Sequence, residues 1–353
     1  MNIVSDNKLL PLVSVVMPVF NSEKFLVSSI QSVLNQSYDC LEFLIINDGS
    51  TDGSEEIILS FTDPRIRYIR LDINVGLAAA CNIAIDMAKG AYIARMDSDD
   101  ICESNRLSDQ LEFLENSDID ICGSAMSIFG ETYKGVRSYP VDDVDIRIHL
   151  LFGNPIAHPT VMGKTTIFKA HKYNPDNRVV EDYELWLLMA LNGVKFGNLQ
   201  HPLVRYRVHS EQVSSLHSSP QLNETRSKAF CFALTQGDLH SLIPDLYPVV
   251  YAERRSISLD EFFNFLLAVS KIIESRNANG DILKIFWVNN FRRIFPMNPI
   301  TSIKSINLAR RLKLDLSFTK YLAAFFQGLL FSDCESRFYR VVEFYIRKRR
   351  ADR

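Results

Sequence analysis

The chain has 353 residues, of which 47% are hydrophobic and 11% aromatic, so it is long enough to bury a substantial core. That length indicates one large domain with an appendage, or two domains. The net charge of −3 is unevenly distributed. Residues 291–353 carry 14 of the 39 Lys and Arg and 5 of the 42 Asp and Glu. Residues 1–290 therefore carry 25 basic and 37 acidic side chains. Such an acidic body argues against nucleic acid as the main ligand.

The six cysteines and the apolar runs argue against two further classes. The cysteines are scattered and form no CxxC pair, which is typical of reduced thiols in a cytosolic protein. The longest apolar runs are shorter than the roughly 18 residues that a membrane span needs, and Met1 to Leu12 lacks the pattern of a signal peptide. We therefore expect a cytoplasmic protein without a transmembrane helix.

Between residues 13 and 96, β-type runs alternate with helical patterns. The predicted strands are Val13–Val19, Leu41–Ile46, Arg65–Ile69 and Ala91–Met96. The predicted helices between them are Phe25–Leu34, a short one after Asp52, and Leu77–Ala88. Strands that are apolar on both faces and alternate with helices predict a parallel α/β sheet covered by helices. Ligands of such sheets bind beyond the carboxyl ends of the strands.

The pattern loosens after this region. A helix from Ser104 to Leu114, a short fifth strand at Ile119–Cys122 and a helix from Val180 to Leu191 are predicted. After Pro220 long helical patterns dominate, so we expect a helical C-terminal module over residues 219–353.

Three carboxylates follow the fourth strand within four residues, in the run Asp97-Ser98-Asp99-Asp100. If the extended backbone continued, Asp97 and Asp99 would project to one side and Ser98 and Asp100 to the other. Converging carboxylates repel each other unless a cation lies between them, and an all-oxygen site suits Mg²⁺ or Mn²⁺, which could also hold a diphosphate. Taken alone, the run is explained as readily by an acidic turn that caps the next helix.

The second strand is followed by Asp48-Gly49-Ser50-Thr51-Asp52. A structural interpretation is a turn at Asp-Gly with Thr51 or Asp52 as the cap of the next helix. A carboxylate at a strand end also suits the imide N–H of uracil or the amino group of cytosine, and Phe20 could stack on the base. Neither GxGxxG after the first strand nor GxxxxGK[ST] occurs, so a Rossmann-type dinucleotide fold and a P-loop NTPase are not supported.

Four motifs together resemble those of the inverting family 2 glycosyltransferases of GT-A fold, in order and spacing: Val15–Asn21, Asn47–Asp52, Asn74–Ala78 and Ala94–Asp100. Glu181–Trp186 is similar to the acidic motif of the family, and Tyr206–His209 with Gln212 and Ser214 is similar to the motif that closes its catalytic domain. The resemblance covers roughly residues 11 to 215. It implies a GT-A-like catalytic domain over residues 1–218, with a mixed-edge sheet and helices on both faces.

The resemblance implies roles for individual residues. The donor-binding residues would be Pro18, Phe20, Asp48, Asp97 and Ser98. Asp99 and Asp97 would hold Mn²⁺ or Mg²⁺, with Asp99 the most direct ligand. His158 and His209 are candidates for contacts to phosphate, and a histidine without such a role is the alternative for each.

Asp182 would be the catalytic base, with Glu181 as the alternative. An inverting transfer needs a base that removes the acceptor hydroxyl proton, and such a base typically contributes about 10²–10⁴-fold. The structural interpretation of both residues is a helix N-terminus enriched in acids. Trp186 is expected to belong to the core rather than to a sugar platform.

One departure from the family concerns a cation. After the Asn74 motif the family commonly places an Arg before an Asn, and here Cys81 precedes Asn82. Arg95 is a candidate to compensate, and the change bears on donor affinity or donor identity.

The predicted function is metal-dependent, inverting transfer of a sugar from a nucleotide-diphospho-sugar, with a UDP-sugar favoured, to a hydroxyl of a glycan or lipid-linked glycan. The resemblance implies a part in O-antigen, capsule or other bacterial surface glycan synthesis. A sugar-phosphate nucleotidyltransferase would need a Gly-rich, Lys- or Arg-bearing loop after the first strand, and Met17 to Ser22 offers none. A non-catalytic nucleotide-sugar-binding protein is the third hypothesis, and Cys81 is the one feature in its favour.

The tail from Arg337 to Arg350 mixes aromatic and basic residues. Such a segment suits an interfacial helix on an anionic membrane, where each basic residue contributes about 1 kcal/mol. A solvated terminal helix explains it equally well. The first interpretation predicts peripheral binding at the inner face of the plasma membrane.

Overall fold

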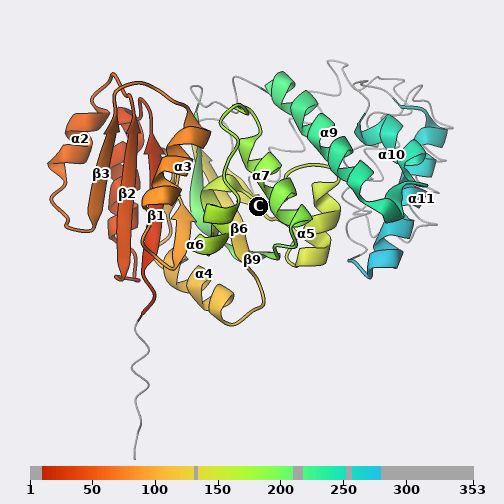
Figure 1. The fold of residues 1–353 in the computed structure, drawn as a ribbon, viewed down its shortest axis with the longest axis horizontal. Helices are drawn as coiled ribbons and strands as arrows, with labels where there is room; N and C mark the ends of the chain where they lie inside the picture. The colour runs from red at the N-terminus through yellow and green to blue at the C-terminus, as the bar shows by residue number, and fades with distance from the viewer. Residues whose placement is uncertain (1–9, 131–133, 210–217, 252–256, 280–353) are drawn as a thin grey trace, which may run out of the picture. The chain divides into compact units, whose positions relative to one another are not determined.

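The computed structural model of the protein describes residues 10–130, 134–209, 218–251 and 257–279. Within these residues the chain forms a nine-stranded mixed sheet with helices packed against it (Figure 1). The strand order is β3-β2-β1-β4-β8-β6-β9-β5, and β7 pairs with β6. The α/β fold class with a mixed edge is therefore confirmed.

The first half of the sheet is parallel. Its strands are β1 (Val13–Val19), β2 (Leu41–Asp48), β3 (Ile66–Leu71) and β4 (Tyr92–Arg95). The helices between them are α1 (Glu23–Leu34), α2 (Ser54–Ser60) and α3 (Leu77–Met87). Because β1 pairs in parallel with both β2 and β4, the carboxyl ends of these strands meet at one rim of the sheet. These predicted strands and helices are confirmed to within two residues at each end.

The second half of the sheet is mixed. Its strands are β5 (Ile101–Cys102), β6 (Ile121–Gly130), β7 (Gly135–Arg137), β8 (Met162–Lys164) and β9 (Phe196–Val208). Its helical segments are α4 (Arg106–Glu115), α5 (Asp143–Leu150), the short turn η1 (His158–Thr160), α6 (Thr165–Ala170) and α7 (Glu181–Leu191). β8 runs antiparallel to β4 and β6, and β6 runs parallel to β9.

The predicted strand Ile119–Cys122 is wrong in length. β6 continues to Gly130 because its backbone stays paired with β9 along its whole course, although small and polar residues such as Gly123 and Ser124 interrupt the apolar pattern. Backbone hydrogen bonds hold a strand together even where side chains give no periodic signal.

The core follows the alternation of β1. Val13, Val15 and Met17 lie on one face with the apolar side chains of α1, α2 and α4, all in one buried cluster. α3 and α6 lie on the front of the sheet in Figure 1, where the buried small residues Ala80 and Ala84 allow α3 to approach closely. Two covered faces explain why all seven residues of β1 are buried.

The helices after the sheet are α9 (Ser218–Thr235), the turn η2 (Gly237–Leu239), α10 (Ile243–Val250) and α11 (Leu259–Arg276). The chain divides into two compact units: residues 1–146 with 154–221, and residues 147–153 with 222–353. α11 begins with a capping box in which Ser258 and Glu261 bond to each other's backbone. None of the described helices combines the length and apolar character that crossing a membrane requires. The apolar set from Tyr321 to Leu330 and the basic tail lie outside the described residues.

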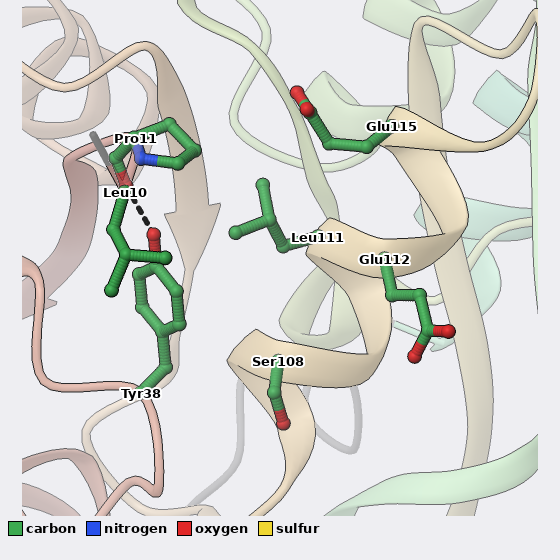
Figure 2. A pocket seen from close by; sticks show the side chains of 7 residues that line it. All are labelled: Leu10, Pro11, Tyr38, Ser108, Leu111, Glu112 and Glu115. Atoms are coloured by element: carbon green, nitrogen blue, oxygen red, sulfur yellow. Dashed lines mark hydrogen bonds between the residues drawn. The ribbon is translucent and has the colours of Figure 1, made fainter. Parts of the chain in front are cut away.

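A pocket of about 270 Å³ lies at the amino ends of the first strands (Figure 2). Its lining residues are Leu10, Pro11, Tyr38, Ser108, Leu111, Glu112 and Glu115. The Tyr38 hydroxyl donates to the Pro11 carbonyl at 2.6 Å and joins the segments that precede β1 and β2. Since the polar rim described below lies at the opposite ends of these strands, this pocket is separate from it.

Candidate active site

Asp48 ends β2 with a buried carboxylate that organises the rim. Its two oxygens accept hydrogen bonds from the backbone N–H groups of Val75 at 2.7 Å and Gly76 at 3.0 Å, directly before α3. The Asn74 amide donates to the Asp48 carbonyl at 3.3 Å. The side chain is 3% exposed. Asp48 therefore joins the ends of β2 and β3, and any contact to a base would use the remaining lone pairs of its oxygens.

The turn after Asp48 requires its glycine. Gly49 has φ +69°, and a Cβ there would lie 2.7 Å from the Asn74 nitrogen. Asp52 accepts hydrogen bonds from the backbone of Ser54 and of Glu23, both at 3.0 Å, so it holds the starts of α2 and α1. Burial opposes the charge of Asp52, but these hydrogen bonds outweigh it and lower the pKa of the carboxyl. The expectation that Thr51 or Asp52 is the cap of this helix is wrong, because the N-cap of α2 is Gly53; Asp52 lies one residue earlier and bonds to the Ser54 backbone from there.

Phe20 and Pro18 differ in what they offer to a ligand. Phe20 is 49% exposed at the carboxyl end of β1, where its ring is available for stacking. Pro18 is buried within the strand and pairs in register with Ile46. Asn21 follows with φ +49° and accepts a hydrogen bond from the Thr51 backbone at 2.8 Å, which ties this end of β1 to the Asp48 turn.

The acidic run after β4 forms a turn and not a continued strand. β4 ends at Arg95, and Asp97, Asp99 and Asp100 each offer a carboxylate oxygen within 4.8 Å of the others. The extended backbone that would have placed Asp100 on the opposite side from Asp97 and Asp99 does not continue, because the chain turns after the strand. The helix-cap explanation is wrong, since α4 begins after Asn105 and no side chain caps it.

Asp100 and Ser98 have structural contacts. Asp100 is completely buried and accepts a hydrogen bond from the Arg207 backbone N–H at 2.8 Å. Burial, together with the neighbouring charges of Asp97 and Asp99, raises the pKa of Asp100 well above its ordinary value. The Ser98 hydroxyl lies 2.7 Å from the hydroxyl of Ser22, just before α1. These contacts fix the turn beneath Asp97 and Asp99.

His209 lies beside Asp99, with 3.0 Å between its Nε2 and the Asp99 Oδ2. Its ring also packs on Phe25, with the two ring centres 4.9 Å apart. A carboxylate and an imidazole nitrogen at this separation are a donor set that Mn²⁺ accepts readily. The sequence offered His209 as a candidate phosphate contact, and its pairing with Asp99 depends on a contact across 110 positions of the chain.

Arg207 was not among the sequence candidates. Its guanidinium stacks on Phe25 and Phe129, 4.5 Å from each ring centre, and its Nε donates to the Asp99 carbonyl at 2.7 Å. Arg207 and His209 are two positions apart at the end of β9, which is the spacing that places both on one side of a strand. The end of β9 therefore holds both the backbone and the side chain of Asp99.

Arg95 is a buried cation in the centre of the site, 3% exposed. It forms an ion pair with Asp97, while its Nε and Nη1 have no hydrogen-bond partner among the described residues. The buried Cys81 thiol lies within its field: burial raises the pKa of Cys81 to about 12, and Arg95 opposes that rise. Arg95 thus supplies positive charge beside Cys81. Its guanidinium is paired with Asp97 and not with Cys81.

Glu181 and Asp182 begin α7, as predicted. Burial and then the charge of Asp182 raise the pKa of Glu181 to about 7. Burial also raises the pKa of Asp182, against hydrogen bonds from the Tyr183 N–H at 2.7 Å and the Asn154 amide at 2.6 Å. Arg95 acts electrostatically on both carboxyls. Both groups therefore have a raised proton affinity, which suits proton transfer.

His158 and Trp186 belong to the core. The His158 Nε2 lies 2.7 Å from the Tyr173 hydroxyl, and burial followed by the charge of Arg95 holds the pKa of His158 well below its ordinary value. Trp186 is completely buried and packs edge-on against His158. The core interpretation of Trp186 is confirmed, and a neutral, enclosed His158 is a poor phosphate contact.

Comparisons with known proteins bear on the family of the chain. Residues 14–173 match the family described as Glycosyl transferase family 2. The chain is 36% identical over 235 residues to an uncharacterized glycosyltransferase of Haemophilus influenzae, covering 62% of this chain and 72% of that protein. It is 32% identical over 211 residues to the O-antigen biosynthesis glycosyltransferase WbnJ of Escherichia coli, covering 58% and 82%.

The fold matches as well. The crystal structure of S. aureus TarS 1–349 in complex with UDP-GlcNAc superposes with a TM-score of 0.55 at 19% identity, covering 89% of this chain and 90% of that one. The chain belongs to glycosyltransferase family 2, and its catalytic sheet has the GT-A fold.

Proposed function

We propose that this protein transfers a sugar from a nucleotide-diphospho-sugar to a hydroxyl acceptor with inversion, using a divalent metal ion. The observation that carries the proposal is the presence of two different carboxylate groups in the field of one buried cation. Asp97 pairs directly with Arg95, and Arg95 acts electrostatically on Glu181 and Asp182. Asp97 and Asp99 are suited to binding a metal ion and a diphosphate. Glu181 and Asp182 are suited to accepting a proton.

We assign the donor half to the ends of β1, β2 and β4. Phe20 would stack on the base, Asp48 would accept a hydrogen bond from it, and Pro18 would form the floor beneath. Asp97 and Ser98 would lie along the ribose and diphosphate. A UDP-sugar is favoured because a carboxylate acceptor matches the imide N–H of uracil. The structural likeness to TarS in complex with UDP-GlcNAc supports the same choice.

The metal site would use Asp99, with His209 and Asp97 beside it. The carboxylate oxygens of Asp97 and Asp99 fit Mn²⁺ or Mg²⁺, and the His209 imidazole beside Asp99 would fit Mn²⁺ better than Mg²⁺. The ion would neutralise the charge that develops on the departing diphosphate. Asp97 would keep its ion pair with Arg95, and buried Asp100 would remain structural.

Asp182 is the proposed base. The acceptor oxygen forms a bond to the anomeric carbon while the bond from that carbon to the diphosphate oxygen breaks, and the hydroxyl proton goes to the carboxylate. The electron pair of the broken bond leaves with the nucleoside diphosphate. Glu181 is the alternative base, since a pKa of about 7 is well matched to proton transfer near neutral pH.

The acceptor is proposed to be a glycan or lipid-linked glycan of a bacterial surface polysaccharide. The similarity to a glycosyltransferase named for O-antigen biosynthesis supports this class. We also propose residues 1–218 as the catalytic domain and 219–353 as a helical module that acts on the cytoplasmic side. We further propose that the basic tail contacts anionic lipid. This proposal fails if deletion of residues 337–353 leaves liposome binding unchanged.

The test is release of nucleoside diphosphate from a panel of nucleotide-sugars, with Mn²⁺, Mg²⁺ or chelator, for wild type and Asp99→Asn. Release that needs both the ion and Asp99 supports the proposal. Tight donor binding without release from any donor would favour the non-catalytic binding protein. Formation of a nucleotide-sugar from nucleotide triphosphate and sugar phosphate would favour the nucleotidyltransferase.

A further inference from the structure

Asn154 makes the one side-chain hydrogen bond to Asp182 found among the described residues of the chain. Its Nδ2 donates to Asp182 Oδ2 at 2.6 Å, while the other oxygen accepts the Tyr183 N–H at 2.7 Å. Asn154 lies 28 positions before Asp182, in the loop between α5 and η1. The proposed base is therefore held from two sides, by its own helix and by a separate loop.

The orientation of the Asn154 amide is determined by its second contact. Its Oδ1 accepts a hydrogen bond from the Ile156 backbone N–H at 3.2 Å, so the oxygen faces the loop backbone. The nitrogen must then face the carboxylate, because a carboxylate accepts and cannot donate when it is charged. The side chain is fixed at both ends although it is exposed to solvent.

The loop itself is anchored to the sheet. Asn198 on β9 is 1% exposed, and its Nδ2 donates to the carbonyls of Pro140 at 2.7 Å and Pro155 at 3.3 Å. Ile156 packs against β6 so closely that a Cβ at Gly123 would lie 3.0 Å from its Cγ2. A rigid support of this kind holds a hydrogen-bond donor in place without further ordering.

The charges around Asp182 oppose one another. Glu181 on the same helix is a like charge, and ionisation of Tyr139 before α5 or of Tyr173 after α6 would add another. Arg95 from β4 favours the carboxylate. Burial favours the neutral acid, so the hydrogen bonds from Asn154 and the helix N–H act with Arg95 to keep the group charged.

We propose that Asn154 is a positioning residue that orients the Asp182 carboxylate and stabilises its charged form for the acceptor hydroxyl. This inference rests on the proposed function, because it takes Asp182 as the base. Asn154 itself touches neither donor nor reacting atoms in this assignment.

The test measures the pKa of Asp182 directly, by carboxyl ¹³C NMR of protein labelled at Asp, with the resonance assigned by its loss in Asp182→Asn. Asn154→Ala removes the donor, and Asn154→Asp keeps the shape while it adds a like charge. Asn192→Ala is the matched control, because Asn192 ends the same helix and donates to the Leu188 carbonyl at 2.8 Å.

We expect the pKa of Asp182 to rise by about one unit in Asn154→Ala and further in Asn154→Asp, and to stay unchanged in Asn192→Ala. An unchanged pKa in both Asn154 variants overturns the inference. Asn154→Asp keeps the test available if Asn154→Ala does not fold.

Failure of this inference is distinguishable from failure of the proposed base. Full nucleotide release by Asp182→Asn removes Asp182 from the base role, and the inference fails with it. An inactive Asp182→Asn together with unmoved pKa values in the Asn154 variants overturns the positioning role alone.

Discussion

The two carboxylate groups of the site are built differently. Asp97, Asp99 and Asp100 lie in a turn after a buried strand, held from below by Arg95 and by the end of β9. Glu181 and Asp182 begin a helix and have raised proton affinity. Burial raises the pKa of Asp97 and of Asp100 in the first group as well, but there Arg95 pairs with Asp97 and opposes the rise. In the second group the pKa of Glu181 is raised to about 7, so this carboxyl can exchange a proton near neutral pH. Both groups consist of carboxylates, so the chemical difference between them comes from where each group lies in the fold and from the side chains and backbone groups that contact it.

The largest expected effect comes from removing the proposed proton acceptor. Asp182→Asn keeps the shape of the side chain but cannot take a proton, so kcat should fall by up to about 10⁴-fold while donor binding is kept. Steady-state release of nucleoside diphosphate measures this. Asp176→Asn, an exposed Asp shortly before α7, is the control. Full activity in Asp182→Asn would transfer the base role to Glu181.

Removing the proposed metal ligand should have a somewhat smaller effect. Asp99→Asn weakens the stabilisation of charge on the leaving diphosphate, which is several kcal/mol or about 10³-fold in rate. The loss should appear as a lost response to added Mn²⁺. Asp118→Asn is the control, because Asp118 is exposed and pairs with Lys195. An unaltered Mn²⁺ response in Asp99→Asn contradicts the assignment of the metal site.

His209→Ala should weaken Mn²⁺ binding by about 10–100-fold, since it removes one side chain of the proposed metal site and leaves Asp99. Electron paramagnetic resonance of free Mn²⁺ gives the affinity. His201→Ala is a close control, because His201 Nε2 lies 3.0 Å from Asp109 Oδ2, the same geometry away from the site. Equal affinities in the two variants would show that His209 serves only to hold Asp99.

The smallest expected effect is on stability. The pKa of Glu181 is raised from 4.5 to about 7 in the folded state, so folding favours its protonated form. That contribution is fully present below pH 4.5 and is lost as pH rises through about 7. Glu181→Gln should therefore gain about 2 kcal/mol relative to wild type between pH 5 and pH 8, measured by urea unfolding. Exposed Glu112→Gln serves as the control, and no pH-dependent gain contradicts the raised pKa.

Much of the parallel half could be predicted from the sequence. Its strands are continuous apolar runs and its helices carry periodic stripes, so local patterns suffice from Val13 to Arg95. Asp48, Asp97 and Asp99 could be found because Asp48 ends such a strand and the other two follow one within four residues.

The second half of the sheet could not be predicted in the same way. β8 has three residues, and β6 and β9 pair across a bulge with an irregular register, so neither gives a periodic signal. The roles of Arg207, His209 and Asn154 depend on contacts that join distant segments, such as Arg207 with Asp99 and Asn154 with Asp182. The Arg and His spacing at the end of β9 was a visible hint, and nothing local marked Asn154.

The central claim is that one carboxylate group holds the donor and the other takes the proton. Calorimetric titration of UDP, and separately of GDP, in the presence of Mn²⁺ tests it on wild type, Asp99→Asn and Asp182→Asn. The account predicts that Asp182→Asn binds the nucleotide as wild type does and that Asp99→Asn loses the Mn²⁺-dependent part of the affinity. Equal loss in both variants, or none in Asp99→Asn, would contradict it.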